Sequence, residues 1–191
     1  MATQVSQRVG IWIIAIVLTF GTLGSFLVMA LSVQNQSTDT ATQLKAYQEQ
    51  QQQAAQLNAD NSVAFDGYSA RKFDASKVTK LKVEVLKQGT GATIKATDSI
   101  NSSYFGWLSD GTIFDSSKKK DTADAPITFS LGGVITGWTK GLAGVKVGSV
   151  VRLTIPAVDA YSSSGSGIIP ANAPLEFIVQ VHKIDNSSTK A

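Results

Sequence analysis

The most apolar part of the chain lies near its start. Residues 11–33 read IWIIAIVLTFGTLGSFLVMALSV, and no charged residue lies between Arg8 and Asp39. A helix of this length spans about 34 Å, more than the ~30 Å hydrocarbon core of a bilayer. The pattern predicts a single transmembrane helix over 11–33 after a short N-terminus, residues 1–10. The alternative is a cleaved signal peptide, but the run is long for one and VMALSV is a poor cleavage site.

A polar stretch without a sustained period follows, residues 34–75. Its middle, residues 42–58, is rich in glutamine and other helix-forming residues and predicts a short surface helix or a spacer. Three aromatic residues come next, Phe65, Tyr68 and Phe73, which could dock onto the following domain. We therefore expect a Gln-rich, partly helical linker that holds this domain near the membrane.

From about residue 76 the hydrophobic period becomes two, which is typical of β-strands. Residues 80–87, 148–156 and 174–184 alternate in this way, and Asp110-Gly111 indicates a tight turn after another strand. The glycine-rich segment 131–148 has room for only one short helix, about Thr136–Leu142. Residues 76–185 are thus predicted to be one mostly antiparallel β-domain, and residues 186–191 a disordered tail.

The amino-acid composition excludes several kinds of binding and catalytic site. The net charge is +3, no basic block is long enough to suggest nucleic acid binding, and Lys118–Lys120 is expected to be a solvated loop. The absence of cysteine excludes disulfides and thiol catalysis. The one histidine, His182, falls on the solvent-facing side of the last strand, so a Ser–His nucleophile is not expected. No residue pattern predicts a metal or a cofactor.

The remaining candidates for a functional site are aromatic residues near turns. Rotation about an X–Pro bond needs no nucleophile and faces a barrier of roughly 18–20 kcal/mol from amide resonance. The twisted amide has less charge separation than the planar one, so an apolar pocket that excludes water favours it. An aromatic pocket without acids or bases suits this reaction.

Three segments resemble the FKBP-type peptidyl-prolyl cis–trans isomerases. They are YFGWLSDGTIFDSS (104–117), FSLGGVITGWTKGLAGVKVGSVVRLTIP (129–156) and AYSSSGSGIIPANAPLEFIVQVHKI (160–184). Their order and spacing match over Lys80–Ile184. The resemblance implies an α+β fold, in which a curved antiparallel β-sheet wraps over one short α-helix. The transmembrane helix and the linker precede it.

The resemblance also implies a site. Trp138 would form the floor under the proline ring, Asp115 would point its carboxylate into the pocket, and Tyr161 would donate a hydrogen bond to a substrate carbonyl. Ile169 would offer its backbone N–H to the ligand. The implied walls and rim are Tyr104, Phe114, Ile127, Val134, Ile135, Ile168 and Phe177.

Some positions depart from the family pattern. Ile127 stands where the family often has Phe, the stretch from Leu131 to Val134 is short, and Ser162 follows Tyr161 where Gly is usual. These departures keep a second hypothesis open, a proline-peptide-binding chaperone or scaffold module without turnover. A third is a structural anchor with a collapsed pocket.

The leading hypothesis is a membrane-anchored peptidyl-prolyl isomerase that assists the folding of exported proteins. Arg8 precedes the apolar run and the next basic residue is Lys45, so the positive-inside rule places the N-terminus in the cytoplasm and the domain outside. The expected partners are proline-containing polypeptides and, through residues 11–33, the lipid bilayer. The resemblance also implies binding of macrolide-type inhibitors. The charge pattern predicts no nucleic acid partner.

Overall fold

The structure is a computed structural model and describes residues 39–185. The transmembrane helix predicted over 11–33, the N-terminus 1–10 and the tail 186–191 lie outside these residues. Within 39–185, no helix is both long and apolar enough to cross a bilayer. The helices are α2 (Asp39–Asn61) and α3 (Thr136–Leu142), and the strands are β1 (Lys82–Lys87), β2 (Ser99–Trp107), β3 (Ile113–Ser116), β4 (Ile127–Ser130), β5 (Val150–Ile155) and β6 (Leu175–Ile184).

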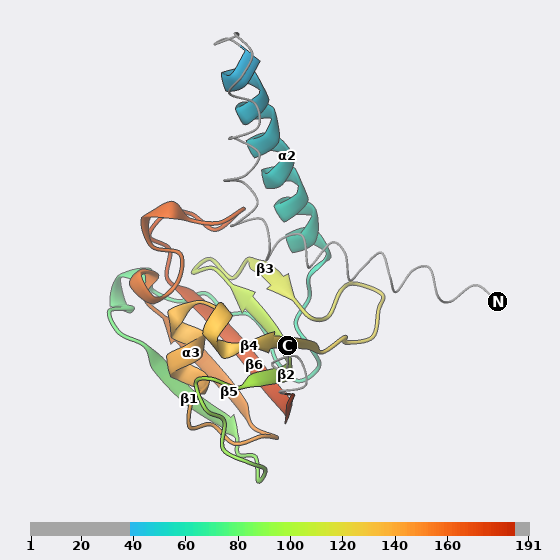
Figure 1. Cartoon of the computed structure of the whole chain (residues 1–191), viewed down its shortest axis with the longest axis vertical. Helices are drawn as coiled ribbons and strands as arrows, with labels where there is room; N and C mark the ends of the chain where they lie inside the picture. Colours follow the sequence, from blue (N-terminus) through green and yellow to red (C-terminus); the bar gives the residue numbers. More distant parts are fainter. Residues whose placement is uncertain (1–38, 186–191) are drawn as a thin grey trace, which may run out of the picture. The chain divides into compact units, whose positions relative to one another are not determined.

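The strands form one antiparallel six-stranded sheet, as the two-residue period predicts. The order is β1-β5-β6-β2-β3, and β4 pairs with β2 beyond the end of β3. The turn at Asp110-Gly111 joins β2 to β3, and Gly111 has φ +91°, a left-handed conformation that glycine adopts easily. The helix α3 lies against one face of this sheet (Figure 1). The FKBP-like arrangement is therefore confirmed.

The main core fills the face that α3 covers. Alternate residues of β6, among them Leu175, Phe177, Val179 and Val181, point into this core. All four are at most 4% exposed. The alternation predicted for residues 174–184 is confirmed, and it places Phe177 beside the helix that carries Trp138.

A second, smaller core covers the opposite face of the sheet. Phe105 and Trp107 of β2 and Ile178 of β6 pack there against Phe65, Tyr68 and Phe73. The Phe65 and Phe105 rings meet edge to face with centroids 5.2 Å apart. The three aromatic residues therefore dock onto the domain. The docking that the sequence suggested for these residues is thus confirmed, and the second half of segment 34–75 packs on the sheet.

Hydrogen bonds hold this segment on the sheet. The Trp107 indole Nε1–H donates to the carbonyl of Arg71 (2.9 Å), and the Phe73 N–H donates to the carbonyl of Ser109 (3.0 Å). The Ser116 hydroxyl donates to the carbonyl of Val63 (2.6 Å). The compact unit built on the sheet begins at Gln48, well before the boundary at residue 76 that the change of period suggests.

Glycines in α3 allow the helix to approach β5 closely. A Cβ at Gly137 would lie 2.4 Å from Cγ2 of Ile155, and one at Gly141 would lie 2.9 Å from Cδ2 of Leu153. The role of these two glycines is to set the distance between the helix and the sheet.

This close approach leads to a first prediction. Gly137→Ala should lower the free energy of unfolding by about 1–3 kcal/mol, the usual cost of overpacking a core, although alanine is the better helix former. Gly133→Ala is the control, because a Cβ there meets no atom within 4 Å. Urea unfolding followed by circular dichroism measures both. Equal stabilities for the two variants would contradict the proposed role of Gly137.

Candidate active site

Trp138 lies at the centre of an aromatic cluster on the α3 face. Its ring contacts those of Tyr104, Phe129 and Phe177 edge to face, with centroid distances of 5.3, 5.0 and 5.2 Å. Trp138 is 5% exposed. The indole therefore forms a dry aromatic surface, and the side chains of Val134 and Ile135, which precede it, pack on the same core.

Phe114 extends this surface from β3. Its ring meets Phe177 edge to face at 5.5 Å. Gly106 of β2 lies beneath both rings, since a Cβ there would be 2.5 Å from Cε1 of Phe177 and 2.6 Å from Cζ of Phe114. The sequence did not single out Gly106 as a site residue. A glycine is needed at position 106 because the rings of Phe114 and Phe177 occupy the space that a side chain would fill.

Asp115 holds the polar edge of the cluster. One carboxylate oxygen accepts a hydrogen bond from the Tyr104 hydroxyl (2.5 Å), and the other accepts from its neighbour's backbone, Ser116 N–H (2.8 Å). The structure thus brings together Asp115, Tyr104 and Trp138, as the resemblance implied. Asp115 orients the phenol of Tyr104, and its carboxylate is half-buried.

The loop after β5 contributes Tyr161, Ile168 and Ile169, which all pack against the same core. The backbone N–H of Ile169 donates to the carbonyl of Ser166 at 2.8 Å. This N–H thus has a partner within the loop, and its role as a donor to the ligand stays a prediction. Ile127, the remaining predicted wall residue, lies on β4 on the same side of the strand as Phe129.

Burial sets the protonation of the two tyrosines. Burial, with the nearby charge of Asp115, raises the pKa of Tyr104 well above its ordinary value. The same two causes raise the pKa of Tyr161. Both phenols therefore keep their protons throughout the physiological range and remain hydrogen-bond donors.

A second prediction concerns alkaline stability. Below the unfolded-state pKa of about 10, the two tyrosines are protonated in both the folded and the unfolded state. They therefore do not make the free energy of unfolding depend on pH in this range. Above it the unfolded chain loses protons that the folded chain keeps, so the free energy of unfolding falls by up to ~1.4 kcal/mol per pH unit for each tyrosine. Urea unfolding between about pH 9 and 11 should show a shallower fall for Tyr104→Phe than for the wild type. Parallel curves would contradict the raised pKa.

Two residues that the sequence did not predict also reach Asp115. Lys119 lies 3.2 Å from its carboxylate, and the Asn58 side-chain amide donates to the same oxygen at 3.0 Å. Lys119 also donates to the Asn58 carbonyl oxygen (2.7 Å). The Lys118–Lys120 run is therefore not a fully solvated loop, because Lys118 pairs with Asp66 and both Lys118 and Lys119 are partly buried. No signal in the sequence links Asn58 to a residue so far along the chain.

The one histidine is part of a polar cluster rather than a catalytic triad. His182 lies 2.7 Å from the hydroxyl of Ser103, and that hydroxyl donates to Asp124. In a triad the carboxylate would orient the imidazole, but here it holds the serine hydroxyl itself. Ser103 is 1% exposed, so no substrate carbonyl can reach it. Within residues 39–185, no three metal-ligating side chains converge on one point.

Comparison with known proteins agrees with this geometry. A model of the FKBP-type peptidyl-prolyl cis–trans isomerase family matches residues 91–182. Over these residues the chain is similar to members of this family. The matched range contains all the predicted site residues, from Tyr104 to Phe177, whereas Asn58 lies before it.

Several known proteins are similar to this chain. The isomerase FkpA of Aeromonas hydrophila is 46% identical over 105 residues, which are 55% of this chain and 38% of that protein. FkpA of Escherichia coli K12 is 32% identical over 146 residues, 76% of this chain and 53% of that protein. The chain thus spans about half the length or less of these relatives. A crystal structure of a peptidyl-prolyl cis–trans isomerase from Pseudomonas syringae pv. tomato has a TM-score of 0.50 and 28% identity, and the match covers 72% of this chain and 95% of that one.

Proposed function

We propose that this protein catalyses the cis–trans isomerisation of X–Pro peptide bonds and so assists protein folding. The observation that carries the proposal is the Trp138 surface, surrounded by the rings of Tyr104, Phe129 and Phe177 and bordered by Asp115. The FkpA proteins to which the chain is similar are named as isomerases of this type.

The mechanism we propose is desolvation of the prolyl amide. The proline ring packs on the indole of Trp138, beside the rings of Phe114 and Phe177. Removal of water weakens the charge-separated planar amide relative to the twisted one. The protonated phenol of Tyr161 donates to a substrate carbonyl and fixes the chain while the bond turns. No proton leaves the protein in any step, so the rate does not depend on a base.

Refolding of a protein limited by proline isomerisation tests this function. The full chain, kept in mild detergent, should accelerate the slow phase, which takes about 10–100 s without a catalyst. The double variant Phe114→Ala, Asp115→Val should not. Binding of the substrate without acceleration would instead support the second function, a proline-peptide-binding module.

We further propose that residues 11–33 anchor the protein in the cytoplasmic membrane, with the FKBP domain on the extracytoplasmic side. The uncharged apolar run and Arg8 before it support this orientation. Protease added to intact cells should then remove the FKBP domain. Protection of the domain until the membrane is broken would place it in the cytoplasm.

Macrolide-type inhibitors are proposed to bind the same aromatic surface. The chain is 40% identical over 109 residues to FK506-binding protein 4 of Chaetomium thermophilum, a match of 56% of this chain and 22% of that protein. Such a macrolide should compete with a proline peptide for the Trp138 surface. Isothermal titration calorimetry measures the binding, and its loss in Trp138→Leu assigns the site.

A further inference from the structure

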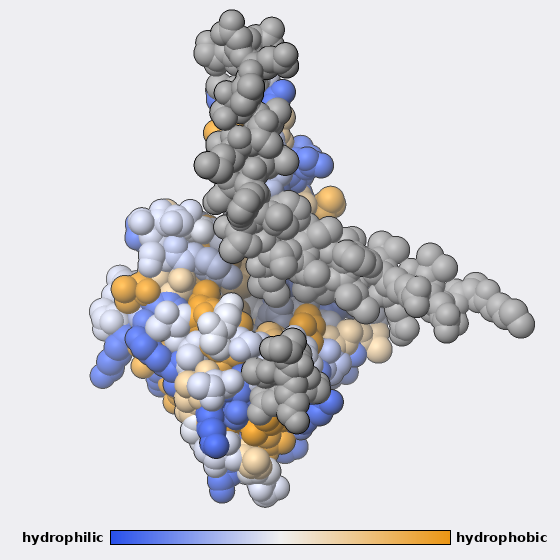
Figure 2. Space-filling view, in the orientation of Figure 1, coloured by the Kyte–Doolittle hydropathy of each residue, from blue (hydrophilic) through white to orange (hydrophobic). Residues whose placement is uncertain are grey.

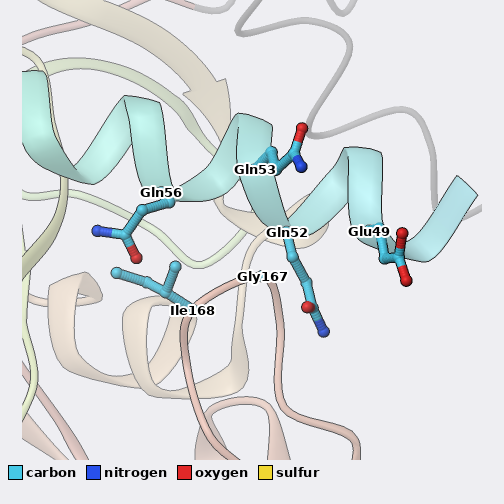
Figure 3. A pocket seen from close by; sticks show the side chains of 6 residues that line it. All are labelled: Glu49, Gln52, Gln53, Gln56, Gly167 and Ile168. Atoms are coloured by element: carbon cyan, nitrogen blue, oxygen red, sulfur yellow. The ribbon is translucent and has the colours of Figure 1, made fainter. Parts of the chain in front are cut away.

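Helix α2 lines a hollow beside the proposed proline site. The hollow has a volume of about 500 Å³ and is lined by Glu49, Gln52, Gln53, Gln56, Gly167 and Ile168. Figure 3 shows Gln52 and Gln56 pointing from the helix toward the loop that carries Gly167 and Ile168. Ile168 also packs against the core that contains Trp138, so this side chain links the hollow to the proposed site.

The C-terminal half of α2 is fixed in this place by specific contacts. The chain just after the helix pairs with the loop after β3, since Val63 N–H donates to the Lys118 carbonyl (3.2 Å) and Lys120 N–H donates to the Asn61 carbonyl (2.8 Å). The Asn58 amide reaches Asp115 at the proposed site. These bonds anchor the helix end to the segment that carries the site.

The loop that carries Gly167 forms the wall opposite α2. It lies so close to the helix that only a small residue fits at position 167. Gly167 has φ +54°, and a Cβ there would lie 2.7 Å from the Cβ of Ala55. Any larger residue at position 167 would push the loop away from α2. The two walls are thus matched to each other, and the hollow between the glutamines and Ile168 is defined by packing on both sides.

The chemistry of the hollow suits a polypeptide backbone. Three of its six lining residues are glutamines, whose amides both donate and accept hydrogen bonds, as backbone N–H and C=O groups do. Gln56 Nε2 donates to Asp60 (2.9 Å), which leaves its oxygen toward the hollow as an acceptor. Where the described residues are visible in Figure 2, their hydrophobic surface appears in separate small areas.

We infer that this hollow is a second substrate subsite, which binds the uncharged polar residues that flank the proline in an extended polypeptide. The inference rests on the proposed function, because the occupant is the remainder of the same substrate chain. The α2 helix then makes the enzyme selective for unfolded proteins over short peptides. Glu49, the single charged residue of the lining, disfavours acidic residues at that end.

The test compares two peptides that share one X–Pro bond, a tetrapeptide and a twelve-residue peptide extended on both sides with Ser, Thr and Gln. The ratio of kcat/KM for the long peptide to that for the short one is measured with the full chain. The double variant Gln52→Ala, Gln56→Ala should lower this ratio by about three- to tenfold, which corresponds to the loss of about one net hydrogen bond. Alanine keeps the helix, and circular dichroism checks the fold.

The double variant Gln50→Ala, Gln51→Ala is the matched control, because these glutamines belong to the same helix and do not line the hollow. It should keep the wild-type ratio. A ratio unchanged by Gln52→Ala, Gln56→Ala, or an equal fall in the control, would overturn the subsite. If the wild type accelerates neither peptide, the proposed function fails, and calorimetric binding of the long peptide to the same variants still decides whether the subsite exists.

Discussion

Trp138→Ala is expected to reduce kcat/KM for a proline peptide by at least ~100-fold, which corresponds to about 3 kcal/mol of lost transition-state stabilisation. The indole is the common neighbour of Tyr104, Phe129 and Phe177. Its loss removes the surface on which the proline ring lies and admits water to the twisted amide. The free energy of unfolding should fall as well, by about 3–5 kcal/mol, since a large buried ring is deleted.

The control separates lost activity from lost stability. Phe105→Ala deletes a ring that is equally buried but lies on the opposite face of the sheet, so it should cost a similar free energy of unfolding. At a temperature where both variants are folded, it should retain most of the activity. If either alanine variant does not fold, Trp138→Leu and Phe105→Leu make the same comparison. If the Trp138 variant and the matching Phe105 variant had equal activities, Trp138 would act only through the stability of the fold.

Deletion of residues 39–75 is expected to produce the other large effect. A fragment of residues 76–191 lacks Phe65, Tyr68 and Phe73, so Phe105, Trp107 and Ile178 lose their cover. Its free energy of unfolding should be at least about 3 kcal/mol lower than that of residues 39–191, since loss of one buried phenylalanine alone costs that much.

A fragment that begins at Ala59 is the control for this deletion. It lacks most of α2 but keeps the aromatic segment, and should therefore be nearly as stable as residues 39–191. Urea unfolding followed by tryptophan fluorescence compares the three fragments. Equal stability of 76–191 and 39–191 would show that the second core contributes nothing measurable.

The features that could be predicted from the sequence depend on local pattern. The alternation in β6 is visible along the chain because one side of the strand faces the main core. The short helix around Trp138 follows from the glycines that bound it, and the order of the motifs indicates the FKBP fold. The grouping of Tyr104, Asp115 and Trp138 came from the family resemblance rather than from any spacing.

The features that could not be predicted depend on contacts between distant segments. Phe65, Tyr68 and Phe73 suggest docking onto the domain, but they have no period that would identify Phe105 and Trp107 as the residues they cover. Asn58 belongs to a glutamine-rich helix of ordinary surface composition, and only the folded chain brings it to Asp115. The hydrogen bond of the Ile169 N–H to Ser166 likewise depends on how one loop closes on itself.

The rate of cis–trans exchange in a short X–Pro peptide, measured by NMR exchange spectroscopy with catalytic amounts of the full chain, tests the central claim most directly. The uncatalysed exchange takes about 10–100 s. The exchange rate should rise in proportion to the protein concentration, and Trp138→Ala should remove the increase while Phe105→Ala should not. An exchange rate that stays at the uncatalysed value while the peptide is bound at the Trp138 surface would contradict it.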